Sequence, residues 1–510
     1  MRVEDLLAFY RSDPRAQMLR RTWEQASAKT ELKGIVGSAT ALLAAACVDV
    51  ELEQAAASEP RASHLFILDD KESAAYLLND LEQLLGKRQR VLFFPRSARV
   101  PYQEEVTENA NIAMRAEVLN EINRAQSGLV IVTFAEAIAE QVISRRELSK
   151  QTFTLSLGES YTLDFLDEVF IEYGFQKVDF VYEPGHYAIR GGIVDVFSFS
   201  FDHPYRIEFF GDEVESIRKF NPINQLSINK MTRAVIVPNV GDRNLHETVE
   251  PIFNFIPGNT RIWMTDANRC EKHLEKAMER AESAFERVSD QMAFTPPSDL
   301  FIGPQNFKRL IEPFHVQEFD GGTSFPERVV IAWDMIPQPS FNKNFDLIAS
   351  NLQGNHRQGY HNVIVAGQAT QIERLHDIFA DRQEEVPHQP IPLELSAGFV
   401  DKDLKLLVYT DHELFERYHR FRLKDGFQKN KQALTLKELM ALQPGDFVVH
   451  IDHGIGEFSG LQKIEVNGKE QEAIRLTYKG GDVLYVNIHS LHRISKYTSK
   501  EGTKPKISKL

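Results

Sequence analysis

The segment Tyr182–Asn224, YEPGHYAIRGGIVDVFSFSFDHPYRIEFFGDEVESIRKFNPIN, is the most informative stretch of this chain. Its pattern predicts three strands. The first two, His186–Arg190 and Ile193–Phe197, flank Gly191-Gly192, a pair that is typical of a bulge or a close backbone approach. The third strand, Tyr205–Phe210, follows a proline-containing loop and ends at turn residues.

Side chains alternate between the two faces of the predicted strand Tyr205–Phe210. One face receives three apolar residues and builds a core, whereas the other displays Arg206, Glu208 and Phe210. An exposed aromatic residue beside an arginine is typical of an interface hot spot, because both offer large contact area at modest entropy cost. The alternative is that Phe210 packs under a neighbouring loop and Arg206 pairs with Glu208, since isolated apolar surface residues are common.

The runs AIRGGIVDVF and PYRIEFFGDEVESIRKF resemble domain 2 of two families, the excision-repair protein UvrB and the transcription-repair coupling factors (Mfd). In both families this domain docks onto UvrA, so the resemblance implies UvrA as a partner. Residue by residue, Arg190, Arg206 and Phe210 fall where Mfd-like sequences place their UvrA contacts. These three are therefore the predicted UvrA-binding residues.

Composition indicates a chain that can bury several cores, since 42% of its 510 residues are hydrophobic and 26% are charged. This length predicts three or four domains. The net charge of −14 argues against a surface devoted to nucleic acid. No run approaches the roughly 18 apolar residues of a membrane span, and Cys47 and Cys270 can form neither a disulfide framework nor a cysteine metal site. We expect a soluble, intracellular protein with no membrane partner, and the family resemblance implies the bacterial cytoplasm.

Residues 1–150 alternate helical and strand patterns, which predicts an α/β layer with a parallel sheet. Short apolar runs and helical spacing place buried strands at 65–68, 91–94 and 129–132 and helices at 72–85 and 113–125. UvrB inserts a long aromatic β-hairpin in this domain to clamp damaged DNA. Here FPRSARVPY, residues 94–102, leads directly into an acidic helical stretch, and Tyr102 alone is no stacking platform.

The loop Gly34-Ile-Val-Gly-Ser-Ala-Thr-Ala41 stands where UvrB has a phosphate-binding P-loop, and three of its residues fit that pattern: Gly34, Gly37 and Ser38. A working loop also needs another glycine, a lysine for the β- and γ-phosphates and a hydroxyl for Mg²⁺. Those three positions hold Ala39, Thr40 and Ala41. Backbone amides can still cradle an anion. We nevertheless expect no nucleotide hydrolysis and interpret this as a degenerate nucleotide loop kept for packing.

The resemblance implies the UvrB-like order 1a, 2, 1b, in which an inserted α+β domain splits one α/β domain. We expect domain 1a at 1–150, domain 2 at 151–235 and domain 1b at 236–325, the last with a strand at 261–265 and a solvated, charged helix at 271–288. A small α/β domain 3 follows at 326–420, with strands at 329–333, 362–366 and 404–409. A linker at 421–436, a domain at 437–500 and the start of another linker at 501–510 complete the prediction.

Strand candidates in the C-terminal region are 447–449, 460–466, 473–478 and 483–488. Turns are expected at Gly454–Gly456, at Gly480-Gly481 and at Asn467-Gly468, which is a strong hairpin signal. Short antiparallel strands at this spacing predict a small barrel. His450, His453, His489 and His492 form two H-x-x-H pairs beside strands, but nothing at helical spacing completes a zinc site, so no metal is predicted.

The phrases GDFVVHIDHGIGEFSG and RLTYKGGDVLYVNIHSLHRISKY resemble the Tudor-like (SH3-like) module of the Mfd family, which CarD-type regulators share. That module binds the β subunit of RNA polymerase. By position the contact falls on the 460–466 strand, so the predicted polymerase-binding residues are Leu461, Lys463, Ile464 and Val466. Leu461 and Ile464 are three apart on a strand and cannot share a face, so one of them is expected to point outward.

The resemblance implies the N-terminal half of a bacterial transcription-repair coupling factor that binds stalled RNA polymerase and recruits UvrA. In that family ATP, Mg²⁺ and most DNA contacts belong to a translocase motor, which we expect to be absent here. The chain is therefore predicted to be a scaffold without cofactors rather than an enzyme. One alternative is a UvrB-like helicase component, against which Thr40 and Ala41 argue. The other is a CarD-type transcription regulator, which failure to bind UvrA would favour.

Overall fold

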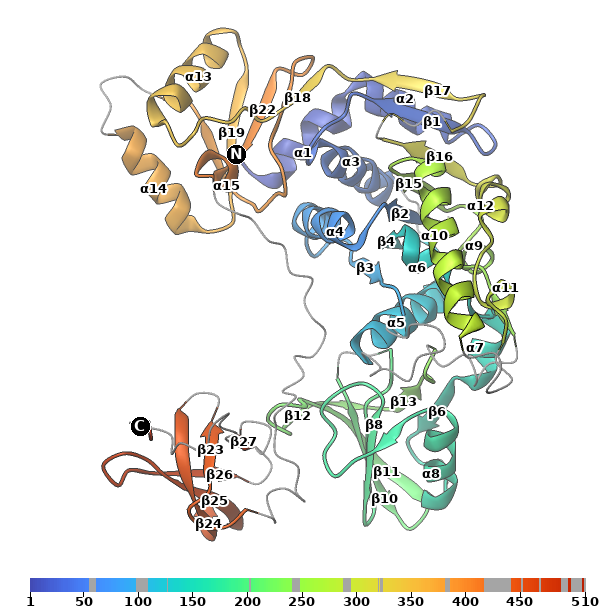
Figure 1. The fold of residues 1–510 in the computed structure, drawn as a ribbon, viewed down its shortest axis with the longest axis vertical. Coiled ribbons are helices and arrows are strands. Elements are labelled where there is room, and N and C mark those ends of the chain that lie inside the picture. Colours follow the sequence, from blue (N-terminus) through green and yellow to red (C-terminus); the bar gives the residue numbers. More distant parts are fainter. Residues whose placement is uncertain are drawn as a thin grey trace. The chain divides into compact units, whose positions relative to one another are not determined.

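The computed structural model has a mixed α/β, multidomain architecture, as predicted (Figure 1). It describes residues 1–510 except 55–60, 98–108, 126, 201–202, 241–247, 288–294, 320, 322–323, 381–385, 417–441, 451–452, 467–468, 488–493, 497–506 and 509–510. The first compact unit combines residues 1–151 with 240–424, and the second combines 152–239 with 425–510. The segment 98–108, where a clamp hairpin is not expected, lies outside the described residues.

The first unit contains a seven-stranded sheet in the order β17-β1-β16-β15-β2-β4-β3, with every neighbouring pair parallel. Its strands are β1 (Lys29–Lys33), β2 (His64–Leu68), β3 (Val91–Phe94), β4 (Val130–Phe134), β15 (Arg261–Met264), β16 (His315–Glu318) and β17 (Val329–Ala332). The apolar strands β2, β3 and β4 are buried throughout, as their sequences predicted. Because β15 and β16 lie between β1 and β2, residues 261–318 return to a sheet that residues 29–134 begin.

Helices accompany this sheet in the first unit (Figure 1). They are α1 (Val3–Ser12), α2 (Pro14–Thr22), α3 (Ala39–Gln54), α4 (Lys71–Leu85), α5 (Asn109–Ala125), α6 (Ala135–Ala139), α7 (Arg145–Gln151), α9 (Ile252–Phe255), α10 (Ala267–Glu286), α11 (Pro297–Leu300) and α12 (Pro304–Ile311), with a short strand pair β5 (Val142–Ile143) and β14 (Val249–Glu250). From Ala39 to Asp49 every residue of α3 is buried. Most of this stretch is alanine-rich and apolar on all sides, and the buried Asp49 pairs with Arg11 and Arg88.

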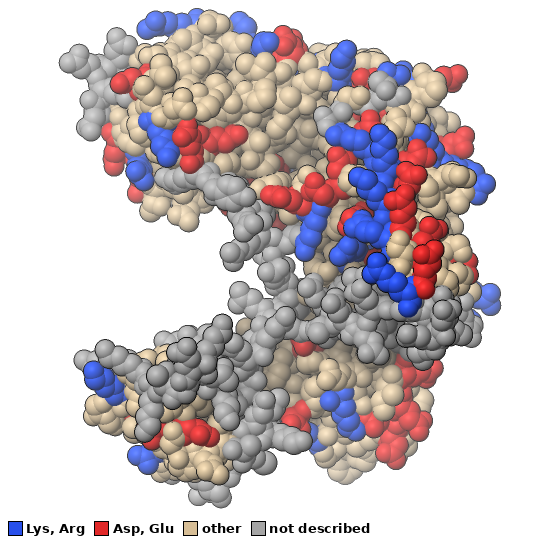
Figure 2. Space-filling view, in the orientation of Figure 1, with Lys and Arg blue, Asp and Glu red and all other residues tan. Residues whose placement is uncertain are grey.

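Charged residues gather on the solvent side of α10, as the alternating charges of its sequence predicted. Figure 2 shows Lys and Arg beside Asp and Glu along this helix. Only small or apolar residues of α10 are buried, among them Cys270 and Leu274. The helix begins at the N-cap Asp266, whose side chain accepts a hydrogen bond from the Arg269 amide at 2.7 Å.

A second sheet in the first unit has the order β18-β21-β22-β19-β20. Its elements are β18 (Met335–Pro337), α13 (Phe345–Arg357), β19 (His361–Ala366), α14 (Ala369–Ala380), β20 (Gln389–Pro392), β21 (Phe399–Asp401), β22 (Leu406–Thr410) and α15 (Asp411–Leu414). The prediction that residues 329–333 supply one of its strands is wrong, because β17 pairs with β1 in the first sheet. Short apolar runs in both sheets look alike in sequence, so the pattern could not assign this one.

Residues 153–236 of the second unit form a six-stranded sheet in the order β12-β11-β10-β9-β8-β7. Its strands are β7 (Gln176–Lys177), β8 (His186–Arg190), β9 (Ile193–Val196), β10 (Tyr205–Phe210), β11 (Glu213–Phe220) and β12 (Ser227–Met231). A separate pair joins β6 (Phe153–Ser156) to β13 (Arg233–Ile236). Helix α8 (Leu163–Glu172) buries Leu166 and Phe170.

The C-terminal region forms a five-stranded sheet in the order β26-β25-β24-β23-β27. Its strands are β23 (Phe447–His450), β24 (Gly454–Val466), β25 (Lys469–Thr477), β26 (Val483–Asn487) and β27 (Ile494–Lys496). The expected turn at Gly454–Gly456 is wrong, because these residues begin β24 and pair with β23. Val466 pairs with Lys469, as the predicted hairpin requires.

Candidate functional site

Two tight hairpins, β8–β9 and β10–β11, position the candidate interface residues in the second unit. Strands β8 and β9 meet at Gly191-Gly192, where Gly191 has a φ of 59°. A Cβ on Gly192 would lie 2.9 Å from the Phe209 carbonyl oxygen, and the Gly192 carbonyl accepts a hydrogen bond from the Phe209 amide at 2.8 Å. The predicted close backbone approach is therefore confirmed, and it holds the hairpin against β10.

Arg190 and Arg206 converge on one buried carboxylate, that of Asp195. Asp195 lies directly opposite Arg206 in the β9–β10 register and is fully buried. Nε of Arg206 donates to Oδ1 at 2.7 Å and Nη2 donates to Oδ2 at 2.8 Å, while Arg190 also donates to Oδ2. Since a buried charge is costly unless it is paired, the two guanidinium groups stabilise Asp195 and Asp195 fixes both of them.

The two guanidinium groups also lie against aromatic rings. The guanidinium carbon of Arg206 lies 4.4 Å from the centroid of the Phe220 ring, and that of Arg190 lies 5.2 Å from the Phe180 ring. Side-chain exposure is 19% for Arg206 and 38% for Arg190. Arg206 is therefore mainly part of the fold, whereas Arg190 keeps more of its surface for another molecule.

Phe210 ends β10 and is 80% exposed, whereas Tyr205, Ile207 and Phe209 on the same strand are buried. The alternative that Phe210 packs under a neighbouring loop is therefore wrong. The proposed pair between Arg206 and Glu208 is also absent from the interactions of these described residues: Glu208 instead accepts hydrogen bonds from Ser216 and Arg218 on β11. The predicted division of β10 into a core face and a polar face is confirmed.

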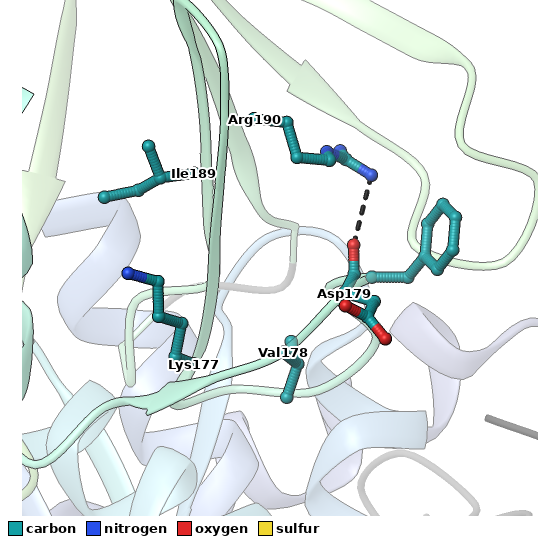
Figure 3. Close-up of a pocket in the computed structure, with 6 residues that line it drawn as sticks. Lys177, Val178, Asp179, Ile189 and Arg190 are labelled. Atoms are coloured by element: carbon teal, nitrogen blue, oxygen red, sulfur yellow. Dashed lines mark hydrogen bonds between the residues drawn. The ribbon is translucent and has the colours of Figure 1, made fainter. Parts of the chain in front are cut away.

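A shallow pocket of about 390 Å³ lies beside Arg190. It is lined by Lys177, Val178, Asp179, Phe180, Ile189 and Arg190. Figure 3 shows Arg190 reaching across to the loop after β7, where its Nη1 donates to the Asp179 carbonyl at 3.1 Å. The pocket therefore lies at the β7–β8 side of this sheet, next to Arg190.

The loop that the sequence suggested as a degenerate nucleotide loop connects β1 to α3 in the first unit. Its residues Gly34, Gly37 and Ser38 contact two segments that flank strands of the second sheet, at Trp333 and at Ala397-Gly398. A Cβ on Gly34 would lie 2.3 Å from the Trp333 carbonyl oxygen, and one on Gly37 would lie 2.9 Å from that of Gly398. Both glycines have positive φ values, 79° and 56°. Ser38 donates its amide to the Ala397 carbonyl at 3.2 Å and accepts the Ala397 amide at 3.0 Å. Thr40 lies inside α3 and is buried.

A buried carboxylate, Asp80 of α4, closes this loop. Its oxygens accept hydrogen bonds from the hydroxyls of Ser38 and Ser396, each at 2.6 Å, and from the Ser396 amide at 2.8 Å. Burial raises the pKa of Asp80 to about 6, although these hydrogen bonds lower it. An acidic group and main-chain carbonyls therefore surround Ser38, which is an unfavourable environment for a phosphate.

The C-terminal sheet presents the predicted polymerase contact on β24. Leu461 is 47% exposed, so its side chain points outward from β24, as one of the pair was expected to do. Lys463, Ile464 and Val466 lie on the same strand, but their side chains are outside the described set. His450 is buried and its ring lies 4.9 Å from that of His453, whereas His489 and His492 are not described.

Sequence reasoning missed Asp195, Asp80 and Ser396. Asp195 interrupts an apolar strand between two arginine-bearing strands, and this lone acid was the available signal. Asp80 and Ser396 are 316 residues apart, so no local pattern could connect them. Among the described residues, no group of three His, Cys, Asp or Glu side chains could hold a metal ion, and no helix is long and apolar enough to cross a membrane.

Two family models match this chain. Residues 153–240 match the UvrB interaction domain, and residues 442–498 match the CarD-like/TRCF RID domain. The first match contains the Arg190–Asp195–Arg206 cluster and Phe210, and the second contains β23 to β27. The fold and site thus define a protein with a UvrB-type interaction module and a CarD-like module.

Curated relatives identify the family more closely. The transcription-repair-coupling factor of Bacillus subtilis (strain 168) is 25% identical over 552 residues, covering 94% of this chain and 46% of the relative. The transcription-repair-coupling factor of Myxococcus xanthus is 25% identical, and the match covers 88% of this chain and 44% of the relative. That of Staphylococcus aureus (strain MRSA252) is 24% identical, and the match covers 81% of this chain and 42% of the relative. The chain is a relative of the transcription-repair-coupling factors, as its sequence predicted. It spans less than half the length of these relatives.

Proposed function

We propose that this chain couples transcription to DNA repair by holding two partners at once. The module at 442–498 binds the β subunit of a stalled RNA polymerase, and the module at 153–240 recruits UvrA. The names of both family models and of the relatives support this assignment. The observation that carries it is the fixed Arg190–Asp195–Arg206 cluster with the exposed Phe210, located inside the segment that matches the UvrB interaction domain. The protein would act in the bacterial cytoplasm.

The side chains of Arg190 and Arg206 are held in place before any partner binds, which suits this surface to binding a protein. Asp195 and the aromatic rings hold both guanidinium groups before binding, so little side-chain entropy is lost when a partner docks. Phe210 offers an exposed aromatic ring, which is the residue type enriched among interface hot spots. In this proposal Phe210 is the apolar anchor and Arg190 the polar contact, while Arg206 mainly positions its neighbours.

Calorimetric titration of UvrA into this chain and into its Phe210→Ala variant tests the proposal. Loss of a hot-spot aromatic should cost about 2 kcal/mol or more, hence at least roughly a tenfold weakening. Phe210 is a better choice than Arg206, because removing Arg206 would also leave the buried Asp195 with one partner fewer. Ile171→Ala is the matched control, since Ile171 is 62% exposed on α8 of the same module. Equal binding by all three proteins would refute the assignment of this face.

We further propose that residues 34–41 are a degenerate P-loop that hydrolyses no nucleotide, and that the C-terminal sheet is a Tudor-like (SH3-like) barrel. The contacts of Gly34, Gly37 and Ser38 with residues 333–398 and the nearby buried Asp80 support the first part. Any ATP- and Mg²⁺-dependent motor of the whole protein, and its main DNA contact, would lie outside these residues. ATP turnover by the purified chain that an Asp80→Ala or Ser38→Ala change abolishes would contradict this.

A CarD-type transcription regulator is the second candidate, because the match at 442–498 is to a CarD-like domain. Pull-down of the RNA polymerase β subunit by this chain, and its loss in a Leu461→Ser variant, would locate the polymerase contact on β24. Polymerase binding without UvrA binding would favour the regulator over the coupling factor.

A further inference from the structure

An exposed apolar loop lies between β11 and β12 in the second unit. Ile223, Leu226 and Ile228 are 60%, 66% and 52% exposed. Single exposed aliphatic residues are common, but three within six positions of the chain form a local apolar patch. None of the three is among the residues predicted to bind a partner. We call residues 221–226 the apolar loop, and Ile228 follows it on β12.

Side-chain hydrogen bonds give the apolar loop a defined conformation. Oδ1 of Asn221 accepts the amides of Ile223 at 2.8 Å and Asn224 at 3.3 Å, and Oδ1 of Asn224 accepts the Leu226 amide at 3.0 Å. The main chain of Asn221 also pairs with that of Leu226 at 2.9 Å and of Gln225 at 2.8 Å. Such Asx turns fix a loop locally. Ile223 and Leu226 are therefore held in solvent by the turn itself rather than by packing.

Gln225 connects the apolar loop to the arginine face, the surface that carries Arg190, Arg206 and Phe210. Its Oε1 accepts a hydrogen bond from Nη2 of Arg206 at 3.2 Å, and its main-chain carbonyl accepts one from Nη1 at 3.4 Å. Gln225 has a φ of 61°, a left-handed conformation that is uncommon for a residue other than glycine. Its Nε2 donates to the Pro222 carbonyl at 2.8 Å. The loop is thus continuous with the candidate interface.

A protein interface of ordinary size that is centred near Arg206 is wide enough to include the apolar loop. Phe210 is four residues from Arg206 along β10, or roughly 14 Å at about 3.4 Å per residue. A stable interface covers roughly 800 Å² on each partner, which corresponds to a circle of about 16 Å radius. An interface that is centred near Arg206 and includes Phe210 therefore extends equally far the other way. Strand β11 runs in that direction from Glu213, opposite Phe210, to Phe220, and the apolar loop follows it.

We propose that Ile223 and Leu226 are a second apolar contact with UvrA, on the opposite side of the arginine cluster from Phe210. This inference rests on the proposed function of the arginine face. The chemistry on the UvrA side is an apolar groove that receives the two aliphatic side chains. Because the turn fixes both side chains before binding, the contact adds affinity at small entropy cost.

Titration of UvrA into four forms of the chain tests this inference: wild type, Ile223→Ser/Leu226→Ser, Phe210→Ala and the control Ile171→Ser. All four keep the buried core, because the changed side chains are exposed, and circular dichroism and thermal melting check this. Two buried aliphatic side chains contribute enough that their loss should weaken binding at least roughly tenfold. The control should bind within about twofold of wild type.

Each other outcome overturns the inference in a distinct way. If the double variant binds like wild type while Phe210→Ala is weakened, the apolar loop lies outside the interface and the proposed function stands. If wild type itself does not bind UvrA, the inference and the proposed function both fail. If sedimentation finds wild-type dimers that the double variant cannot form, and UvrA binding is equal, the loop contacts a second copy instead.

Discussion

The buried carboxylate of Asp80 should make the first unit less stable as the pH rises. Its pKa is about 6 in the folded chain and ordinarily 3.8, so the folded state binds this proton more tightly than the unfolded state. Protonation therefore stabilises the fold at low pH, and that contribution is lost as the pH rises from about 4 through about 6. The total is about 3 kcal/mol, of which roughly 1 kcal/mol falls between pH 5 and pH 8.

Asp80→Asn removes this titration and keeps the shape of the side chain. We expect the variant to gain roughly 1 kcal/mol of unfolding free energy relative to wild type on going from pH 5 to pH 8. Urea unfolding followed by tryptophan fluorescence measures this, since all three tryptophans, Trp23, Trp263 and Trp333, lie in the first unit. The comparison must be a difference between the two proteins, because burial also lowers the pKa of His64 to about 3 and its contribution is lost as the pH falls.

Parallel pH profiles for the two proteins would refute this reasoning, because they would mean that Asp80 takes up no proton on folding in this range. A variant whose stability relative to wild type falls, rather than rises, from pH 5 to pH 8 would refute it more directly. That result would mean that the hydrogen bonds from Ser38 and Ser396 outweigh the cost of burying the charge.

Two further predictions concern the first unit. Gly37→Ala should destabilise it by at least about 1 kcal/mol more than Gly86→Ala in the same urea assay, because both glycines have a φ near 55° but only a Cβ at position 37 would meet a carbonyl oxygen, that of Gly398. Equal losses would mean that the contact with Gly398 relaxes. Burial raises the pKa of Cys47 to about 11 and that of Cys270 well above its usual value. Both thiols should therefore react with Ellman's reagent at pH 8 at least roughly a hundredfold more slowly in the native chain than in urea. A rapid reaction of the native chain would contradict their burial.

Local periodicity explains what could be predicted from sequence. The alternation along β10 placed Phe210 outside and Ile207 inside, and the structure agrees because both properties depend on neighbours in the same strand. The helical spacing of α10 was equally readable. The UvrA-binding role of Arg190, Arg206 and Phe210 stays a prediction, as does the polymerase-binding role of the β24 residues.

What could not be predicted depends on contacts between distant segments. The shared carboxylate of Asp195 requires the register of three strands, and the Asp80–Ser396 hydrogen bonds require the two sheets of the first unit to be packed together. Gly454 was expected to be a turn residue, but it begins β24 and pairs with His450 of β23. In each case the local sequence indicates what kind of residue is present but does not identify the distant residue that it contacts.

Strand β17 has a practical consequence for anyone dividing this chain into fragments. It is the terminal strand of the seven-stranded sheet and covers the edge of β1. A fragment that stops near residue 325, where the sequence suggests a boundary, would leave the backbone amides and carbonyls of β1 unpaired on that side. Exposed edges of this kind recruit strands from other molecules and cause aggregation. A soluble version of the first sheet should therefore include residues through Trp333.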